Sequence, residues 1–393
     1  MLKIGIVGAG PAGLYFALLM KRQHPDSQIH IVEQNPAGAT YGWGIVFSAR
    51  ALGFLGASDP ASYADLRAQM QSWNDQVIGL NGQVVRIDGF GFSGMARLDL
   101  LRILQDHCRR LGVEMTFETR LTDLRVFADA DLIVGADGAN SMVRQLYAEQ
   151  FQPSVELLSN HYVWYGTPQT FDALSLLFRE YQGGAYVAHA YPYSQHTSTF
   201  IVECAAQTWQ QTGLEAMSEE ESRAWCERVF AEELQGKPLL TNRSLWLNFK
   251  VVANQRWSHD NVVLLGDALR SVHFSIGSGT RMALEDAIAL YHACQTTKTI
   301  PDALAAFEAE RRPSADQMLD VAALSYRWYE QFGQKMKTDP LPFAYDYLLR
   351  SGQLTHERLR GRAPKFMAAY DASQEELAQK LAAEAQGNIS KAP

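Results

Sequence analysis

The feature that most constrains this chain is a glycine-rich turn that directly follows its first predicted strand, residues 2–7. The turn reads Gly8-Ala9-Gly10-Pro11-Ala12-Gly13, and a helical apolar pattern follows it. In a βαβ unit the first glycine permits the tight turn, the second lets the backbone approach a pyrophosphate, and the third lets helix and strand pack closely. Pro11 suits the first turn of a helix, where its missing N–H costs nothing. The sequence therefore predicts a parallel α/β sheet with a phosphate site at the N-terminus of its first helix.

An acidic residue at the end of the second predicted strand supports this interpretation. Glu33 ends the strand expected over residues 28–33 and lies about 20 residues after Gly13, the spacing of a ribose-binding carboxylate. An acid there favours an unphosphorylated ribose, so the motif indicates FAD or NAD rather than NADP. The alternative is a glycine turn in an unrelated α/β fold, which the order strand, turn, helix, strand and acid disfavours.

Two later glycine motifs favour FAD over NAD. A predicted buried strand ends at Gly266-Asp267, where the carboxylate can accept hydrogen bonds from ribitol hydroxyls, a group that NAD lacks. The second motif opens the helix predicted from about residue 279 to 294, and its N-terminus places positive charge where a reduced flavin ring becomes anionic. The candidate cofactor residues of this second motif are Gly277, Gly279 and Thr280.

Two further residues are candidates for cofactor contact, each with a structural alternative. Asp137 precedes Gly138 in another acid-glycine turn before a predicted helix, and it can equally be the cap of that helix. Arg97 begins the helix predicted over residues 97–111 and can reach a dinucleotide phosphate, although an isolated arginine is more often a surface charge. The order of the three segments 8–13, 137–144 and 266–280 along the chain is the stronger argument.

Composition excludes several other functions. The chain has 393 residues and a formal net charge of −8, which argues against a general nucleic-acid binder. Its four cysteines have no metal-type spacing, so no metal site is predicted. Without a leader pattern or a run of about 18 apolar residues, no membrane association is expected and the predicted location is the cytoplasm. The oligomeric state is not predicted.

The pattern of elements predicts an α/β (α+β) protein with a discontinuous nucleotide domain. A Rossmann-like FAD-binding domain is expected from residues 1–70, 93–155 and 251–330. Residues 71–92 and 156–250, rich in aromatic and β-branched residues, are expected to form an inserted antiparallel substrate-binding sheet. Residues 331–393 are expected to be a C-terminal helical segment, with a polar, fraying end from about residue 377.

The motifs together resemble the FAD-dependent aromatic hydroxylases related to para-hydroxybenzoate hydroxylase, over roughly residues 1–330. Within that family the chain is most similar to the hydroxylase part of salicylyl-CoA 5-hydroxylases and 2-aminobenzoyl-CoA monooxygenases, and more loosely to the pyrrole hydroxylase of violacein formation. The segments that carry this closer resemblance are 41–48, 164–167, 171–173, 189–191, 198–203 and 273–280. The chain departs from the wider family in lacking a proline in the segment 272–275. A reductase-like second half, as in the bifunctional aryl-CoA enzymes, is not expected, so hydroxylation alone is the expected activity.

The resemblance implies a reaction and a set of candidate catalytic residues. NADH or NADPH is expected to reduce FAD, and O2 to form a 4a-hydroperoxyflavin that hydroxylates an activated aromatic ring. The resemblance also implies that the backbone of the loop at Gly44 lies close to the flavin ring. His189 and Tyr191 share one face of a predicted strand and can line an aromatic pocket, although a core position is an alternative. The candidate catalytic residues are His189, Tyr191, His273 and Trp43.

The aromatic substrate is expected to be a coenzyme A thioester, with an indolic compound as the second candidate. A basic segment in this acidic chain suits the phosphates of coenzyme A, although a solvated helix face is the alternative. Its members are Arg350, His356, Arg358, Arg360, Arg362 and Lys365. A halogenase, a flavin reductase and a non-catalytic escort protein of similar fold are competing hypotheses. The absent Trp-x-Trp-x-Ile-Pro segment argues against the halogenase, and the complete set of flavin motifs argues against the escort.

Overall fold

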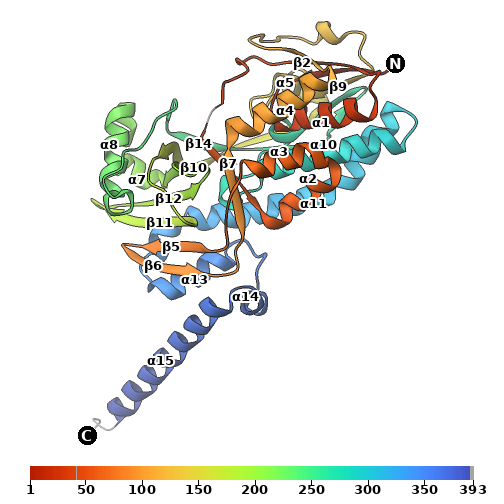
Figure 1. Ribbon diagram of the computed structural model, residues 1–393. Coiled ribbons are helices and arrows are strands. Elements are labelled where there is room, and N and C mark those ends of the chain that lie inside the picture. Colours follow the sequence, from red (N-terminus) through yellow and green to blue (C-terminus); the bar gives the residue numbers. More distant parts are fainter. Residues whose placement is uncertain (41, 390–393) are drawn as a thin grey trace.

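The structure is a computed structural model that describes residues 1–40 and 42–389, without the side chains of residues 49, 50 and 381–389. Tyr41, the first residue of one resemblance segment, and residues 390–393 of the predicted tail lie outside the described residues. Three sheets and a C-terminal set of helices make up the molecule, as Figure 1 shows. The predicted α/β class with a Rossmann-like domain and a second sheet is confirmed.

A six-stranded sheet carries the glycine-rich turn. Its strands are parallel except for the short edge strand β15, and their order is β15 (Ser258–His259), β16 (Val262–Leu264), β9 (Leu132–Gly135), β1 (Lys3–Val7), β2 (Gln28–Val32) and β8 (Glu114–Thr116). The helices packed around it include α1 (Pro11–Gln23), α4 (Arg97–Leu111) and α10 (Gly279–Thr296). Smaller helices of this region are α2 (Ala49–Ser58), α3 (Pro60–Ala68), α5 (Met142–Leu146) and α6 (Ala148–Phe151), with 3₁₀ turns at Arg125–Phe127 and Gly266–Ala268.

Sequence patterns explain where the helices of this sheet begin and end. Helix α1 starts at Pro11, as expected from the tolerance of proline in the first helical turn. Helix α4 spans the predicted residues and ends at Gly112, which adopts the left-handed conformation with φ 83° that favours glycine. Its apolar face at Leu100, Leu101, Leu104 and Cys108 is buried in the core.

A seven-stranded sheet forms the second layer. Its order is β14 (Leu247–Asn254), β10 (Pro153–Thr167), β13 (Ser198–Cys204), β12 (Gly184–Pro192), β11 (Leu174–Tyr181), β5 (Gln76–Leu80) and β6 (Gln83–Ile87). All pairs are antiparallel except β11 with β5, which run parallel. One face packs on α8 (Glu219–Val229) and α9 (Ala231–Leu234), near α7 (Ala206–Gln211) and a 3₁₀ turn at Leu214–Ala216. The division into domains by residue ranges stays a prediction.

A three-stranded sheet and the C-terminal helices connect these layers. The small sheet has the order β3 (Gly44–Ser48), β7 (Phe92–Ala96) and β4 (Gln71–Trp73), and a 3₁₀ turn lies at Phe274–Ile276. The predicted helical region contains α11 (Ile300–Tyr329), α12 (Phe332–Lys335), α13 (Pro340–Leu349), α14 (His356–Arg362) and α15 (Pro364–Ile389). Helix α15 projects away from the rest of the molecule (Figure 1). Among the described helices, none has the length and apolar character needed to cross a membrane.

Aromatic packing holds the C-terminal helices against the other face of the seven-stranded sheet. The ring of Phe178 in β11 is fully buried, and its centroid lies 4.8 Å from that of Phe343 in α13 and 5.8 Å from that of Trp328 in α11. Tyr329 and Tyr347 also contact this ring. Because α8 covers the opposite face, the central strands of the sheet are buried on both sides.

We expect Phe178→Ala to lower the free energy of unfolding by about 3–5 kcal/mol, because the truncation leaves a cavity between the sheet and helices α11 and α13. Urea unfolding followed by tryptophan fluorescence measures the change. The matched control is Leu324→Ala on α11, whose side chain is 49% exposed. That substitution should change stability by less than about 0.5 kcal/mol. Equal effects of the two substitutions would contradict this account of the packing.

Candidate functional site

A large cavity of about 1490 Å³ lies where the three sheets and the C-terminal helices meet. Its wall contains the N-terminal ends of α1 and α10, residues of β3, β11 and β12, and the segment 347–362. Single-ligand pockets commonly measure roughly 300–1,000 Å³. The cavity is therefore large enough for a cofactor and a substrate together.

The three glycines of the first turn have different roles in the structure. A Cβ on Gly8 would lie 2.4 Å from the carbonyl oxygen of Ala136, and a Cβ on Gly13 would lie 2.4 Å from the carbonyl oxygen of Gly8. Those two glycines are required by the packing of the chain itself. A Cβ on Gly10 would have its nearest neighbour at 3.8 Å, and the φ of −77° at Gly10 suits any residue. Gly10 lines the cavity, so its missing side chain leaves room for something other than the protein.

The start of α1 has the features of a phosphate site. Gly10 is the N-cap residue and supplies no side-chain hydrogen bond, so the first N–H groups of the helix have no side-chain partner from the cap. Pro11 and Ala12 line the cavity beside Gly10. Free N–H groups and the positive end of the helix dipole favour an anion, and this geometry fits the pyrophosphate of FAD.

Glu33 is held beside this turn at the end of β2. Its carboxylate accepts hydrogen bonds from the backbone N–H of Ala9 at 2.8 Å and from that of Asn35 at 2.8 Å. These contacts fix the carboxylate next to the glycine turn, although Glu33 is outside the cavity lining. A carboxylate has further lone pairs, so its oxygens can still accept ribose hydroxyls.

Asp267 and Arg97 line the cavity together and interact through their charges. Asp267 follows β16, and Arg97 is the first residue of α4. Desolvation by the surrounding protein raises the pKa of Asp267, whose side chain is exposed to the cavity, and the positive charge of Arg97 opposes that rise. A carboxylate beside a guanidinium can bind both hydroxyl and phosphate oxygens, which are the groups of a ribitol phosphate. Gly266, which adopts φ 58°, lines the cavity beside them.

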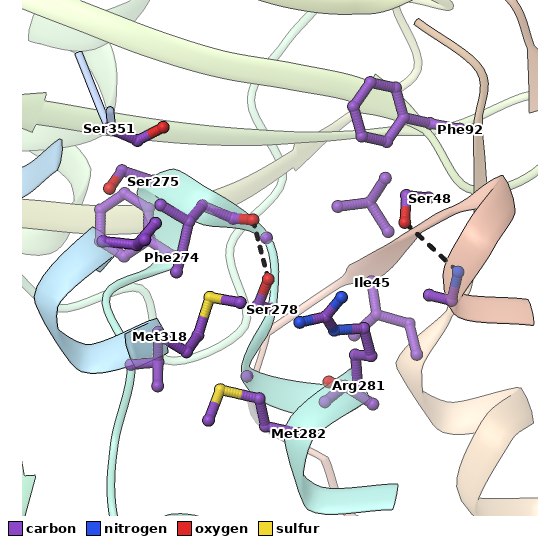
Figure 2. A pocket seen from close by; sticks show the side chains of 18 of the residues that line it. Ile45, Ser48, Phe92, Phe274, Ser275, Ser278, Arg281, Met282, Met318 and Ser351 are labelled. Atoms are coloured by element: carbon purple, nitrogen blue, oxygen red, sulfur yellow. Dashed lines mark hydrogen bonds between the residues drawn. The ribbon is translucent and has the colours of Figure 1, made fainter. Parts of the chain in front are cut away.

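The start of α10 forms another part of the cavity wall. Gly277 adopts φ 59°, and Ser278 donates its hydroxyl proton to the carbonyl oxygen of Ile276 at 3.1 Å instead of capping the helix (Figure 2). Gly279 and Thr280 follow in the cavity lining. The N-terminal N–H groups of this 18-residue helix therefore favour negative charge at the cavity wall.

Asp137 binds the first N–H groups of helix α5, which fits the alternative that it caps a helix. Its Oδ2 accepts hydrogen bonds from the backbone N–H groups of Met142 at 2.7 Å and Val143 at 3.1 Å, at the start of α5. Its neighbours Ala136 and Gly138 line the cavity, whereas Asp137 is outside the lining. Its Oδ1 is buried without a hydrogen-bond partner in the described part of the chain.

The structure brings two of the four candidate catalytic residues to the cavity. His189 and Tyr191 of β12 both line it, on the shared face that the two-residue period predicts. The Tyr191 hydroxyl donates a hydrogen bond to the Gly44 carbonyl oxygen at 2.9 Å, and the backbone N–H of Gly44 donates to Thr199 Oγ1 at 2.8 Å. Gly44 lines the cavity at this junction of β3 with the seven-stranded sheet.

The other two candidates lie outside the main cavity lining. His273 lines a second cavity of about 210 Å³, together with Ser271 and Tyr326. Burial lowers the pKa of His273 to about 4. Trp43 packs its indole against Gly166, where a Cβ would lie 2.7 Å from the ring. A catalytic role for these two residues therefore rests on the family resemblance alone.

Several residues at the cavity or directly behind its wall were not predicted from the sequence. The side chains of Ile45 and Phe92 lie across the cavity from Phe274 (Figure 2). These three residues together are called the apolar wall. Glu203 lies behind His189 and is only 1% exposed. A carboxylate in an otherwise apolar strand was the available sequence signal for Glu203. The apolar wall had no such signal, since its members come from β3, β7 and the turn before α10.

The basic C-terminal segment divides into residues that reach the cavity and residues that do not. Arg358 and Arg362, four residues apart on α14, line the cavity. Arg360 instead donates to Asp371 Oδ2 at 2.9 Å. Arg350 also lines the cavity, but its guanidinium donates to the carbonyl oxygen of Ser275 at 2.7 Å and to Ser325 Oγ at 3.1 Å. His356 contacts the Tyr345 hydroxyl through Nδ1, and Lys365 is outside the lining.

Comparison with known proteins agrees with this geometry. The family model described as FAD binding domain matches residues 125–322. Salicyloyl-CoA 5-hydroxylase of a Streptomyces species is 38% identical over 361 residues, which cover 89% of this chain and 70% of that protein. Protodeoxyviolaceinate monooxygenase of Chromobacterium violaceum is 37% identical over 359 residues, which cover 90% and 95%.

The fold of a solved structure is also similar. 2-Methyl-3-hydroxypyridine-5-carboxylic acid oxygenase superposes with a TM-score of 0.71 over 89% of this chain and 96% of that one, at 17% identity. That identity supports the fold alone, whereas the two sequence relatives support the family. The glycine turn, the carboxylates and the uncapped helix ends all fit FAD. This chain therefore belongs to the family of FAD-dependent aromatic monooxygenases.

Proposed function

We propose that the protein hydroxylates an activated aromatic ring that is joined to coenzyme A through a thioester, with NADH or NADPH as the electron donor. The observation that carries this proposal is the position of Arg358 and Arg362, which line the same cavity as the glycine turn and the start of α10. Guanidinium groups suit the phosphate oxygens of coenzyme A. The name of the salicyloyl-CoA relative supports the same substrate class.

The cofactor is proposed to be held by groups spread along the cavity and at its edge. When bound, FAD accepts electrons from the reduced nicotinamide and activates O2. The start of α1 at Gly10 is proposed to bind the pyrophosphate, Glu33 the adenosine ribose, and Arg97 and Asp267 the ribitol phosphate region. The N–H groups at the start of α10 stabilise negative charge on the ring system.

The aromatic ring of the substrate is proposed to lie against the apolar wall of Ile45, Phe92 and Phe274. Apolar side chains on several sides exclude water from the reacting ring, which protects a reactive oxygen species from wasteful breakdown. His189 lines the cavity and has a buried carboxylate neighbour, Glu203. The long arm of coenzyme A then runs toward α14.

The substrate proposal predicts that salicyloyl-CoA stimulates NAD(P)H oxidation by the FAD-loaded protein more strongly than free salicylate does. The physical reason is that the thioester adds phosphate contacts that the free acid lacks. Initial rates of nicotinamide oxidation, with product identified by mass spectrometry, measure the difference. If free salicylate, or an indolic substrate such as protodeoxyviolaceinate, stimulates oxidation as strongly, the thioester proposal is wrong.

Arg358→Ala should raise the KM for the thioester roughly tenfold with little change in kcat, because about 1.4 kcal/mol of uniform binding is lost. The matched control is Arg360→Ala. Arg360 lies two residues from Arg358 and carries the same charge, but its guanidinium is paired with Asp371. Arg362 is left unchanged because its Nε donates to the Gly89 carbonyl oxygen. Equal effects of the two substitutions would place the phosphate site elsewhere.

Gly10→Ala should lower the affinity for FAD at least about tenfold while the melting temperature of the apo-protein stays almost unchanged. The added methyl group meets no protein atom closer than 3.8 Å but occupies space at the start of α1. Gly53→Ala is the control, since its Cβ meets nothing within 4 Å and lies outside the cavity lining. Flavin fluorescence titration measures the affinity, and normal FAD binding by Gly10→Ala would refute this assignment.

A further inference from the structure

A buried carboxylate lies on the substrate side of the seven-stranded sheet. Glu203 belongs to β13, in which all seven residues are buried, and its own exposed fraction is 1%. Directly opposite it in register are Tyr162 of β10 and Val187 of β12. A charge in such a position is costly unless neighbouring groups hydrogen-bond to it or share a proton with it.

The two oxygens of Glu203 have different neighbours. Oε1 accepts a hydrogen bond from Asn160 Nδ2 at 2.7 Å. Oε2 lies 3.4 Å from His189 Nε2. Among the described residues neither Oε2 nor Nε2 has a hydrogen-bond partner, so their separation of 3.4 Å is a close contact and not a formed hydrogen bond. These two atoms are therefore positioned to share one proton with each other.

The His189 ring is held so that one nitrogen faces the carboxylate. Its centroid lies 5.2 Å from that of Tyr329, at an interplanar angle of 25°, and 5.2 Å from that of Phe274, at 79°. Because Nε2 is directed to Glu203 and His189 lines the main cavity, Nδ1 is the nitrogen left for a ligand. The pair thus joins a fixed imidazole at the cavity wall to a carboxylate behind it.

The groups around Glu203 favour its ionised form. Burial by itself raises the pKa of Glu203, but the contact with His189 and the hydrogen bond from Asn160 favour the carboxylate, so the pKa lies below its ordinary value. Burial lowers the pKa of His273, which lies near the carboxylate, to about 4, so that ring is neutral near pH 7. Tyr162 and Tyr329 also face the carboxylate, and burial raises the pKa of both hydroxyls.

A cation lies nearby on the C-terminal helices. The Arg350 guanidinium is 5.8 Å from the Tyr329 ring centroid, but it donates its hydrogen bonds to Ser275 and Ser325. It is therefore committed to the C-terminal helices and to the turn before α10. The Glu203 carboxylate therefore faces the His189 imidazole without a competing hydrogen bond from Arg350.

We propose that His189 and Glu203 recognise a hydroxyl group on the substrate ring and take up its proton. The O–H bond of the substrate breaks, an N–H bond forms at His189 Nδ1, and the Nε2–H of the resulting imidazolium is stabilised by Glu203. No electrons leave the ring, and the ring oxyanion makes the ring more reactive toward an electrophilic oxygen. His189 is the catalytic residue, and Glu203 is a positioning residue that acts through it. The inference rests on the proposed function only in taking the substrate to be an activated aromatic ring.

The bound phenol reports this proton transfer directly. The probes are 5-nitrosalicylate and its coenzyme A thioester, whose absorption changes when the phenol ionises, so difference spectra against pH give the pKa of the bound hydroxyl. With Glu203→Gln, the imidazolium loses its anionic partner. The pKa of the bound phenol should then rise by about one unit, a tenfold fall in the ionised fraction at a given pH. His189→Gln should shift the pKa in the same direction.

The matched control is Glu233→Gln, which neutralises a carboxylate of α9 that is 13% exposed and paired with Arg179. It should leave the pKa of the bound phenol unchanged. If Glu203 acted merely as a nearby negative charge, Glu203→Gln would lower that pKa, because a charge that repels the phenolate is removed. A lowered or unchanged pKa overturns the inference.

A second variant and a second probe keep the test decisive. If circular dichroism shows that Glu203→Gln does not fold, His189→Gln at the cavity wall decides alone, and an unchanged pKa in that variant overturns the inference. Both probes carry the same phenol. If only the free acid binds to the unaltered protein, the coenzyme A proposal fails, and the proton-transfer test is completed with 5-nitrosalicylate.

Discussion

Two helices begin at the same cavity with backbone N–H groups that no capping side chain satisfies. Helix α1 starts behind Gly10 and helix α10 behind Ser278, and neither cap residue supplies a side-chain hydrogen bond to its helix. Unsatisfied donors and aligned helix dipoles make such a place favourable for anions. The parallel strands β1, β9 and β16 end beside one another, so the residues after their carboxyl ends meet in one region. The cofactor site depends on this convergence.

Close packing at glycines makes the convergence possible. Side chains at Gly8 and Gly13 would collide with backbone oxygens, so the approach of α1 to its strand requires both glycines. Gly10 has no comparable neighbour in the protein, which separates a glycine needed for folding from a glycine that leaves room for a ligand. The same short motif thus serves the fold and the site through different residues.

The second sheet supplies the opposite wall, and its burial on both faces controls what that wall can contain. Helix α8 covers one face and the C-terminal helices cover the other, so polar side chains there need partners. Asn160 meets this requirement in part by donating to Glu203 Oε1, and His189 Nε2 lies 3.4 Å from Glu203 Oε2. Helix α14 is anchored to the loop after β6 through Arg362 and the Gly89 carbonyl oxygen, and Arg358 of the same helix lines the cavity.

Local patterns in the sequence determined the βαβ opening, the helix over residues 97–111 and the cofactor motifs at Gly8–Gly13 and Gly266–Asp267, because these depend on glycine conformation and on short apolar periods. Local patterns also placed His189 and Tyr191 on one strand face. Which charges reach the cavity was decided by the tertiary structure. Arg358 lines it and Arg360 does not, because the docking of α14 selects one helix face. Likewise, only the pairing of β12 with β13 places Glu203 behind His189, since strand register and helix docking are set by contacts between segments far apart in the chain.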